Sequence, residues 1–215
     1  RDLHLSIRRQ RQMCIRDRAW LGIVWLTNVF NFMDGSDGMV SGPSMVAALF
    51  LSAWFYCIDD TIFFWLNLAV AGSCGGFLVL NWSPARVFLG DAGSLSLGYY
   101  FAVMALIGIV KHDLPIMAFV FLYGLFLADT TVTLVRRMVA GKPWWQAHTE
   151  HFYQRAIRNG FSHRRVATVT ILLTLLCGLT ASVEVFDLLI QPLPALGFVI
   201  LLVVAGQLSR REQRG

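Results

Sequence analysis

The stretch NVFNFMDGSDG, residues 28–38, places two amides and two carboxylates at a constant spacing of three between apolar segments. Residues three apart lie near one face at the end of a helix, so these side chains should line one edge of the chain. The four residues are Asn28, Asn31, Asp34 and Asp37. A polar helix cap followed by a glycine turn is the simpler alternative, but it leaves four polar groups in one register unexplained.

The composition around this stretch is that of a membrane protein. Of 215 residues, 56% are hydrophobic and only 14% are charged, and the mean hydropathy is +0.60. A soluble domain of this size does not bury so much apolar surface. Because strand alternation is absent, we expect an all-α transmembrane bundle. Six complete spans are predicted at residues 39–58, 61–80, 94–110, 114–135, 166–186 and 193–208, with residues 19–33 as part of a seventh.

The distribution of basic residues predicts the orientation of these spans. If the loop at Asp34 lies on one side, eleven basic residues fall on that side and Lys111 alone falls on the other. The positive-inside rule then makes the Asp34 side cytoplasmic. The formal net charge of +5 is accordingly interpreted as contact with anionic lipid, and no nucleic-acid partner is expected.

The two ends of the chain differ from its middle. Residues 1–18 carry six arginines and are predicted to be an atypical, foreign segment. Residues 19–208 form the expected transmembrane domain, and residues 209–215 form a basic cytoplasmic tail. The four cysteines show no CxxC pair, so neither a disulfide framework nor a zinc site is indicated.

A second polar cluster occupies residues 81–94, where glycines flank Asp91 at the expected start of a helix. Backbone amides at a helix start favour an anion, and a carboxylate beside them can hold a divalent cation that bridges phosphates. An ordinary N-cap at Asp91 or Ser94 is the alternative.

A third cluster lies in the basic loop 136–165, which contains His148, His151 and Arg155. Arginine and imidazole groups near a bilayer surface can bind phosphate, although a basic loop that touches lipid head groups is the alternative. Asp129, near the end of a predicted span, is either a functional residue or the partner of Arg136 or Arg137. The pair at residues 59 and 60 is interpreted as a solvated turn on the external side.

Together these three ordered motifs resemble the polyprenyl-phosphate N-acetylhexosamine-1-phosphate transferase superfamily, which is glycosyltransferase family 4. The resemblance runs from about residue 20 to residue 165. It implies transfer of a sugar 1-phosphate from a UDP-N-acetylhexosamine to undecaprenyl phosphate, with release of UMP and a need for Mg²⁺, or alternatively Mn²⁺. It also implies a location in the bacterial plasma membrane, and a homodimer is one option that the sequence leaves open.

The resemblance also implies roles for individual residues. Asp91 matches the metal-binding aspartate of the family. The implied catalytic residues are Asp34, Asp37, His148 and His151, and the implied substrate-binding residues are Asn28, Asn31, Asn81, Phe88 and Arg155. Of the latter, Asn81 and Phe88 correspond to positions that hold the uracil ring.

The chain departs from the family pattern in two places. It lacks the aspartate-rich DDxxD motif of an earlier loop, so we expect an N-terminally truncated chain that is inactive by itself. Its histidine loop reads HTEH at residues 148–151, which resembles the O-antigen-initiating branch more than the peptidoglycan enzyme. A transporter, a membrane scaffold and a CDP-alcohol phosphotransferase were the rival interpretations, but no internal repeat or CDP-alcohol motif is visible.

Overall fold

The computed structural model describes residues 2–143, 146 and 148–186, with side chains from residue 16 onward. Within these ranges the chain forms eight helices and no strand, which confirms the predicted all-α class. They are α1 (Asp2–Met33), α2 (Ser41–Cys57), α3 (Thr61–Asn81), α4 (Gly90–His112), α5 (Ile116–Leu122), α6 (Gly124–Val139), α7 (Phe152–Arg158) and α8 (His163–Val185).

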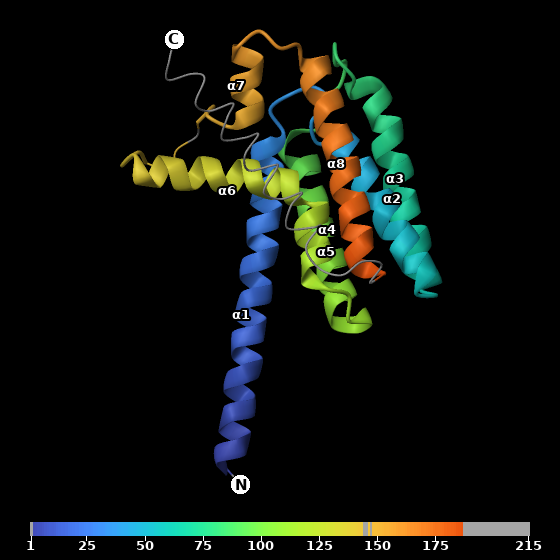
Figure 1. Ribbon diagram of the computed structural model, residues 1–215, viewed down its shortest axis with the longest axis vertical. Helices are drawn as coiled ribbons and strands as arrows, with labels where there is room; N and C mark the ends of the chain where they lie inside the picture. The colour runs from blue at the N-terminus through green and yellow to red at the C-terminus, as the bar shows by residue number, and fades with distance from the viewer. Residues whose placement is uncertain (1, 144–145, 147, 187–215) are drawn as a thin grey trace.

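The helices form a bundle whose functional loops gather at one end (Figure 1). Helix α1 packs against α4 and α6, α2 packs against α3 and α8, and α5 packs against α8. Figure 1 shows α6 crossing the direction of the bundle and α7 above α6, level with the upper part of α8. The loops 34–40 and 82–89 lie at one end of the bundle, together with residues 148–151 and helix α7. We call this end of the bundle the site end.

The number of spans is lower than the sequence predicted. In the described part of the chain, three helices are long and apolar enough to cross a membrane, namely α3, α4 and α8. Helix α2 is apolar but has only 17 residues. The predicted span 193–208 and the tail 209–215 lie outside the described residues. The boundaries of α3 and α8 fall within three residues of those predicted, since the apolar runs themselves are unbroken.

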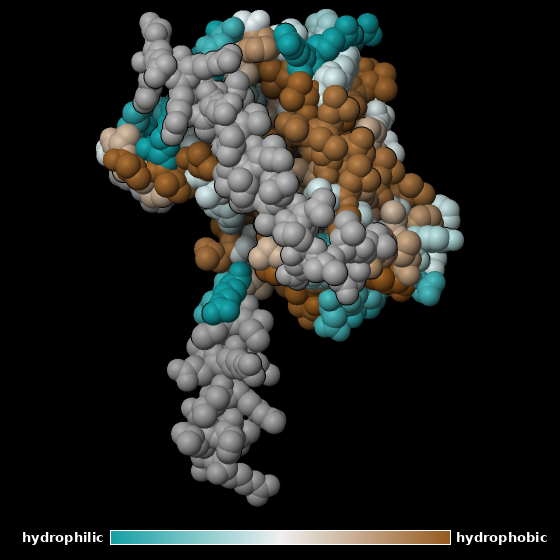
Figure 2. Space-filling view, in the orientation of Figure 1, coloured by the Kyte–Doolittle hydropathy of each residue, from teal (hydrophilic) through white to brown (hydrophobic). Residues whose placement is uncertain are grey.

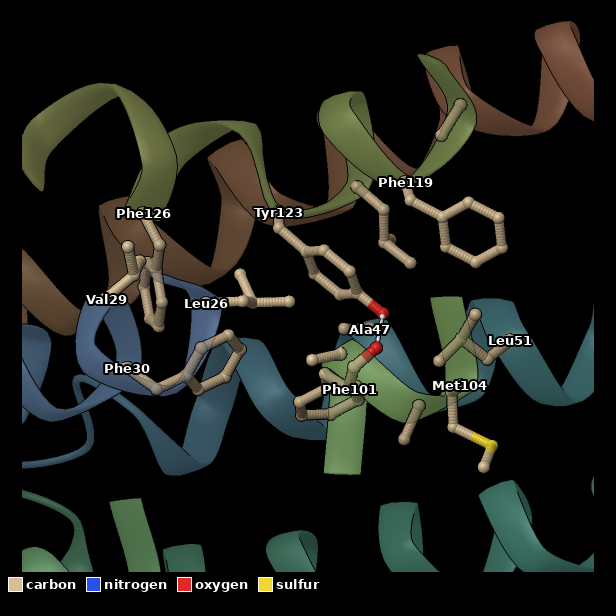
Figure 3. Packing of buried hydrophobic residues seen from close by; sticks show 14 of the residues in the cluster. Leu26, Val29, Phe30, Ala47, Leu51, Phe101, Met104, Phe119, Tyr123 and Phe126 are labelled. Carbon is tan, nitrogen blue, oxygen red and sulfur yellow. Dashed lines mark hydrogen bonds between the residues drawn. The ribbon is translucent and has the colours of Figure 1, made fainter. Parts of the chain in front are cut away.

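The prediction of one continuous span at residues 114–135 is wrong. Helices α5 and α6 meet at Tyr123 with a bend of 78°, so the pair is at most one broken span. An aromatic cluster holds this bend (Figure 3): the ring of Phe30 stacks on Phe101 at 5.2 Å and meets Phe126 edge-on at 5.1 Å. The Tyr123 hydroxyl donates a hydrogen bond to the Phe101 carbonyl over 3.2 Å. The bend therefore follows from packing on α1 and α4, which hydropathy does not reveal.

The outer surface agrees with a bundle in lipid. Figure 2 shows hydrophobic residues over the visible side of the bundle around α8, with hydrophilic residues at its two ends. Large apolar side chains on α3 are exposed, among them Ile62, Trp65 and Val79. Exposed apolar surface of this extent matches an apolar solvent rather than water.

At the end opposite the site, Asp60 is not the solvated turn residue that the sequence suggested. It is 9% exposed, caps α3 by accepting a hydrogen bond from Phe63 N, and contacts Lys111 Nζ at 2.6 Å and His112 Nε2 at 3.0 Å. Lys111 holds the pKa of the Asp60 carboxyl below its usual range. The contacts of Asp60 with Lys111 and His112 thus join the α2–α3 turn to the end of α4.

Packing of α1 on α4 depends on Gly98. A Cβ at this position would lie 2.8 Å from the Cα of Thr27 and 2.9 Å from its carbonyl oxygen. Because backbone cannot move aside as a side chain can, the two helices approach this closely only over glycine.

We predict that Gly98→Ala lowers the thermal stability of the detergent-solubilised protein by separating α1 from α4. The matched control is Gly76→Ala in α3, where an added Cβ meets nothing within 4 Å and helix propensity favours alanine by about 1 kcal/mol. Melting followed by tryptophan fluorescence measures both variants. Equal melting temperatures for the two would contradict the close approach.

Candidate active site

The first two sequence motifs meet where α1 lies against α4. Asn31, in the last turn of α1, donates from Nδ2 to Asp91 Oδ1 at 2.9 Å and to Ser94 Oγ at 3.1 Å. Asp91 lies exposed in the first turn of α4, and Ser94 is fully buried. The N-cap of α4 is Leu89, without a side-chain hydrogen bond, so the N-cap alternative does not hold for Asp91 or Ser94.

Asp34 is the second carboxylate of this region. It follows α1 directly and accepts a hydrogen bond from the backbone of Gly90. The pKa of Asp34 is raised to about 6, chiefly by burial and also by the negative charge of Asp91, while the Gly90 hydrogen bond lowers it. Two carboxylates thus lie close enough to repel each other, an arrangement that a cation between them would relieve.

Asp37 and Asn81 connect the loop after α1 to the loop after α3. Asp37 Oδ2 accepts a hydrogen bond from Ala85 N at 3.2 Å. Asn81 is 5% exposed, accepts from Gly38 N and Ser41 Oγ, each at 2.9 Å, and donates to Val87 O at 2.9 Å. The structure therefore gives Asn81 a position inside the protein, and its predicted contact with uracil stays a prediction.

Phe88 has the opposite environment. Its side chain is 74% exposed and lies in the loop that Asn81 holds through Val87, three residues before Asp91. An exposed aromatic ring next to a carboxylate cluster is free to stack on a planar ligand. The predicted role at the uracil ring therefore agrees with its position, although no contact tests it.

The histidine loop packs against the end of α1. The ring of His151 lies 5.0 Å from that of His148 and 6.1 Å from that of Phe32, in stacked arrangements. The hydroxyl of Tyr153 donates to the carbonyl of Phe32 at 3.1 Å, and it also fills the space where a Cβ on Gly35 would stand. The third motif thus adjoins the first, as the sequence predicted for one face of the membrane.

Asp129 is a site residue whose contacts the sequence did not reveal. Its carboxylate contacts His151 Nδ1 and accepts hydrogen bonds from the first amides of α7, at Phe152 and Tyr153. The alternative that Asp129 pairs with Arg136 or Arg137 is wrong, because both arginines contact Glu150 instead. The position of Asp129 near the end of a predicted span marked it as a candidate functional residue. Its contact with His151 could not be predicted, because the two residues are 22 positions apart.

Two cationic residues of the basic loop are bound to an acid within it. Glu150 Oε1 contacts Arg137 Nη1 at 2.7 Å and Lys142 Nζ at 2.9 Å, and these partners keep the pKa of the Glu150 carboxyl below its usual range. Arg155, predicted to bind substrate, is 7% exposed on α7 and is not among the residues that line the groove described next.

A groove of about 610 Å³ runs between α1 and α6 and ends at the histidine loop. One part is apolar and the other carries amide, hydroxyl and imidazole groups. The apolar part is lined by Leu21, Val24, Trp25, Phe32 and Leu134, and the polar part by Asn28, Asn31, Thr130, Gln146, His148 and His151. Because Asn31 also binds Asp91, the polar end of the groove adjoins the two carboxylates.

The donor set near Asp34 and Asp91 fits a hard cation. Magnesium is held by one or two carboxylates, with water and substrate phosphates as its other ligands. Within the described part of the chain, no three His, Cys, Asp or Glu side chains cluster as a metal site, so a zinc-type cage is not found there. Asp34 and Asp91 are the residues of this region that could hold such a cation.

Comparison with known proteins identifies the class. Residues 13–109 match the family model Glycosyl transferase family 4. The chain is 32% identical over 165 residues to a probable undecaprenyl-phosphate N-acetylglucosaminyl 1-phosphate transferase of Bacillus subtilis (strain 168), covering 76% of the chain and 46% of that relative. These matches support assignment of the matched part of the chain to glycosyl transferase family 4, in which the curated relatives are named as polyprenyl-phosphate sugar-1-phosphate transferases and related enzymes.

Other relatives differ in the substrate that their names give. A decaprenyl-phosphate N-acetylglucosaminephosphotransferase of Mycobacterium leprae (strain TN) is 27% identical over 164 residues, which are 66% of the chain and 41% of the relative. A phospho-N-acetylmuramoyl-pentapeptide-transferase of Heliobacterium modesticaldum (strain ATCC 51547 / Ice1) is 40% identical over 103 residues, which are 48% of the chain and 32% of the relative. The chain spans less than half the length of these curated relatives.

The raised pKa of Asp34 predicts a pH dependence of cation binding. With a pKa of about 6, Asp34 is mostly ionised at pH 7 and about one tenth ionised at pH 5, so Mn²⁺ affinity should fall about tenfold between them. Electron paramagnetic resonance of free Mn²⁺ measures this. Asp34→Asn should bind the ion weakly at both pH values, and equal affinity of the unaltered protein at pH 5 and pH 7 would rule out Asp34 as a ligand.

Proposed function

We propose that this protein transfers an N-acetylhexosamine 1-phosphate from a UDP-sugar to a polyprenyl phosphate such as undecaprenyl phosphate. The observation that carries the proposal is the position of Asn31, which lines the groove and donates a hydrogen bond to Asp91. The Asn31 side chain thus links the partly apolar groove to the carboxylate proposed to bind the cation. Family membership supports the same reaction class.

The groove fits the lipid acceptor. Its apolar part, between α1 and α6, offers Val24, Trp25 and Leu134 to an isoprenoid chain, and its polar part offers His148 and Asn28 to a phosphate. Amphiphilic ligands need this division, because an apolar tail gains by burial and a phosphate needs donors. Helix α6 crosses the bundle direction at the site end, where a lipid head group would lie.

The reaction needs little covalent chemistry from the protein. An oxygen of the lipid phosphate attacks the β-phosphorus of the UDP-sugar, a new P–O bond forms, and the bond from the β-phosphorus to the bridging oxygen breaks. UMP leaves with the electron pair, and the product is a lipid-linked diphosphate sugar. A bound magnesium ion would supply electrostatic stabilisation of the phosphate oxygens. The chain contributes position and hydrogen-bond donors.

Individual residues take roles that follow from their places. Asn31 orients Asp91 by its hydrogen bond, and Asp37 holds the loop before Phe88 through Ala85 N. His148 lines the groove and is half-buried, and burial with the neighbouring His151 lowers its pKa. The neutral imidazole can donate one hydrogen bond to a phosphate oxygen, and its other nitrogen is an acceptor.

The site end is proposed to face the cytoplasm, where nucleotide sugars are made and where the positive-inside rule places it. The product would begin a lipid-linked cell-envelope glycan. The choice between an O-antigen-type N-acetylhexosamine donor and a MurNAc-pentapeptide donor belongs to the same proposal, and the HTEH loop favours the former.

The test is UMP release by the full-length protein with undecaprenyl phosphate, Mg²⁺ and either UDP-N-acetylglucosamine or UDP-MurNAc-pentapeptide. We expect turnover with the former that Asp91→Asn lowers at least 100-fold, because an amide is a poor ligand for a hard cation. Asp113→Asn is the matched control, an exposed aspartate in the turn after α4 at the opposite end, and should keep its activity. No release from either donor would overturn the proposal.

A separate prediction concerns Phe88. If its exposed ring stacks on uracil, Phe88→Ala should raise the KM for the UDP-sugar about 5- to 100-fold with little change in kcat, since a base on an aromatic ring is worth about 1–3 kcal/mol. Phe88→Tyr should restore the KM. A collapsed kcat with unchanged KM would instead indicate that the loop had been deformed.

A further inference from the structure

Asp129 occupies an unusual position on α6. It is 6% exposed, and its two oxygens serve the start of α7: Oδ1 accepts from Phe152 N at 3.0 Å and Oδ2 accepts from Tyr153 N at 3.3 Å. A buried carboxylate is costly unless donors surround it. These backbone donors belong to the first turn of α7, where amides lack partners within the helix.

The same carboxylate reaches the imidazole of His151. Nδ1 of this ring lies 3.1 Å from Asp129 Oδ1. The ring is 3% exposed and stacks between Phe32, His148 and Tyr153, with centroid distances of 6.1, 5.0 and 6.0 Å. Stacking of the neighbouring rings and the contact at Nδ1 therefore both fix the orientation of the His151 ring. The same ring lines the groove between α1 and α6.

We propose that Asp129 is a positioning residue that fixes the tautomer of His151. An ionised carboxylate only accepts hydrogen bonds, so the nitrogen facing it must carry the proton. Nδ1 is then the donor, and Nε2 is left as the nitrogen that can serve a phosphate in the groove. The catalytic meaning of this assignment rests on the proposed transferase function, but the tautomer itself does not.

The neighbouring contacts separate this role from general support of the loop. Glu150, one residue before His151, is bound to Arg137 and Lys142 and holds the loop to the end of α6 without touching the imidazole. Thr133, one turn after Asp129, donates to the same Asp129 Oδ1 at 3.3 Å. Removing the Thr133 hydroxyl therefore perturbs the same oxygen while the contact to His151 remains.

The test is ¹⁵N magnetic resonance of the histidine-labelled protein in detergent at a pH where imidazole is neutral. His151→Gln assigns the ring signals. We expect Nδ1–H and an unprotonated Nε2 in the unaltered protein and in Thr133→Val. In Asp129→Asn the share of the Nδ1–H form should fall, because an amide can donate to Nδ1 as well as accept from it. Asparagine at position 129 also keeps one side-chain oxygen that can accept from the backbone amides at the start of α7, much as asparagine does at helix N-termini.

Two results of this experiment would overturn the proposal. The first is Nε2–H as the main form in the unaltered protein, and the second is an identical tautomer ratio in Asp129→Asn. If Asp129→Asn does not fold, the signals of the unaltered protein and of Thr133→Val still decide between the tautomers.

The catalytic consequence is measured in the full-length protein. Asp129→Asn should lower kcat about 100-fold or more with a smaller change in KM, as expected for misplaced proton transfer or phosphate contact, while Thr133→Val stays near the unaltered rate. A failure of the transferase proposal shows as absence of UMP release in the unaltered protein, whereas a failure of the Asp129 proposal shows as an unchanged tautomer or an unchanged kcat in Asp129→Asn.

Discussion

The close approach of α1 and α4 is the constraint on which the site depends. Gly98 leaves room for the backbone of Thr27, and one turn further along the same interface Asn31 reaches Asp91 and Ser94. Asp34 then lies beside Gly90 at the start of α4. A wider helix spacing would break the hydrogen bonds and separate the two carboxylates, so the acidic site is a product of helix packing and not of the loop sequence alone.

The bend between α5 and α6 is the second geometric requirement. A straight continuation would carry Asp129, Arg136 and Arg137 along the bundle direction, whereas the 78° turn places α6 across the site end. There α6 forms one wall of the groove, and its Asp129 reaches the start of α7. The aromatic rings of Phe30, Phe101 and Phe126 stabilise this turn from α1, α4 and α6.

Hydropathy predicted the features that depend on composition alone. It gave the helical class and the extent of α3, and the spacing of residues 28–38 predicted polar groups that the structure indeed brings to one end of the bundle. The bend was missed because the run 114–135 is apolar throughout and its break is set by tertiary contacts. The hydrogen bonds by which Asn81 joins two loops could not be predicted from the sequence, because a buried amide that joins two loops has the same sequence signal as one that binds a ligand.

The charges around the site favour recognition of phosphate through a cation. Two carboxylates face the region where a diphosphate would bind, and burial already raises the pKa of one of them. Arg137 and Lys142, which could have offset this negative charge, are bound to Glu150 in the histidine loop. Negative side chains and a negative substrate repel each other unless a divalent ion lies between them. A cation would relieve this repulsion, which supports the proposal that Asp34 and Asp91 hold magnesium while the histidine loop contacts the acceptor phosphate.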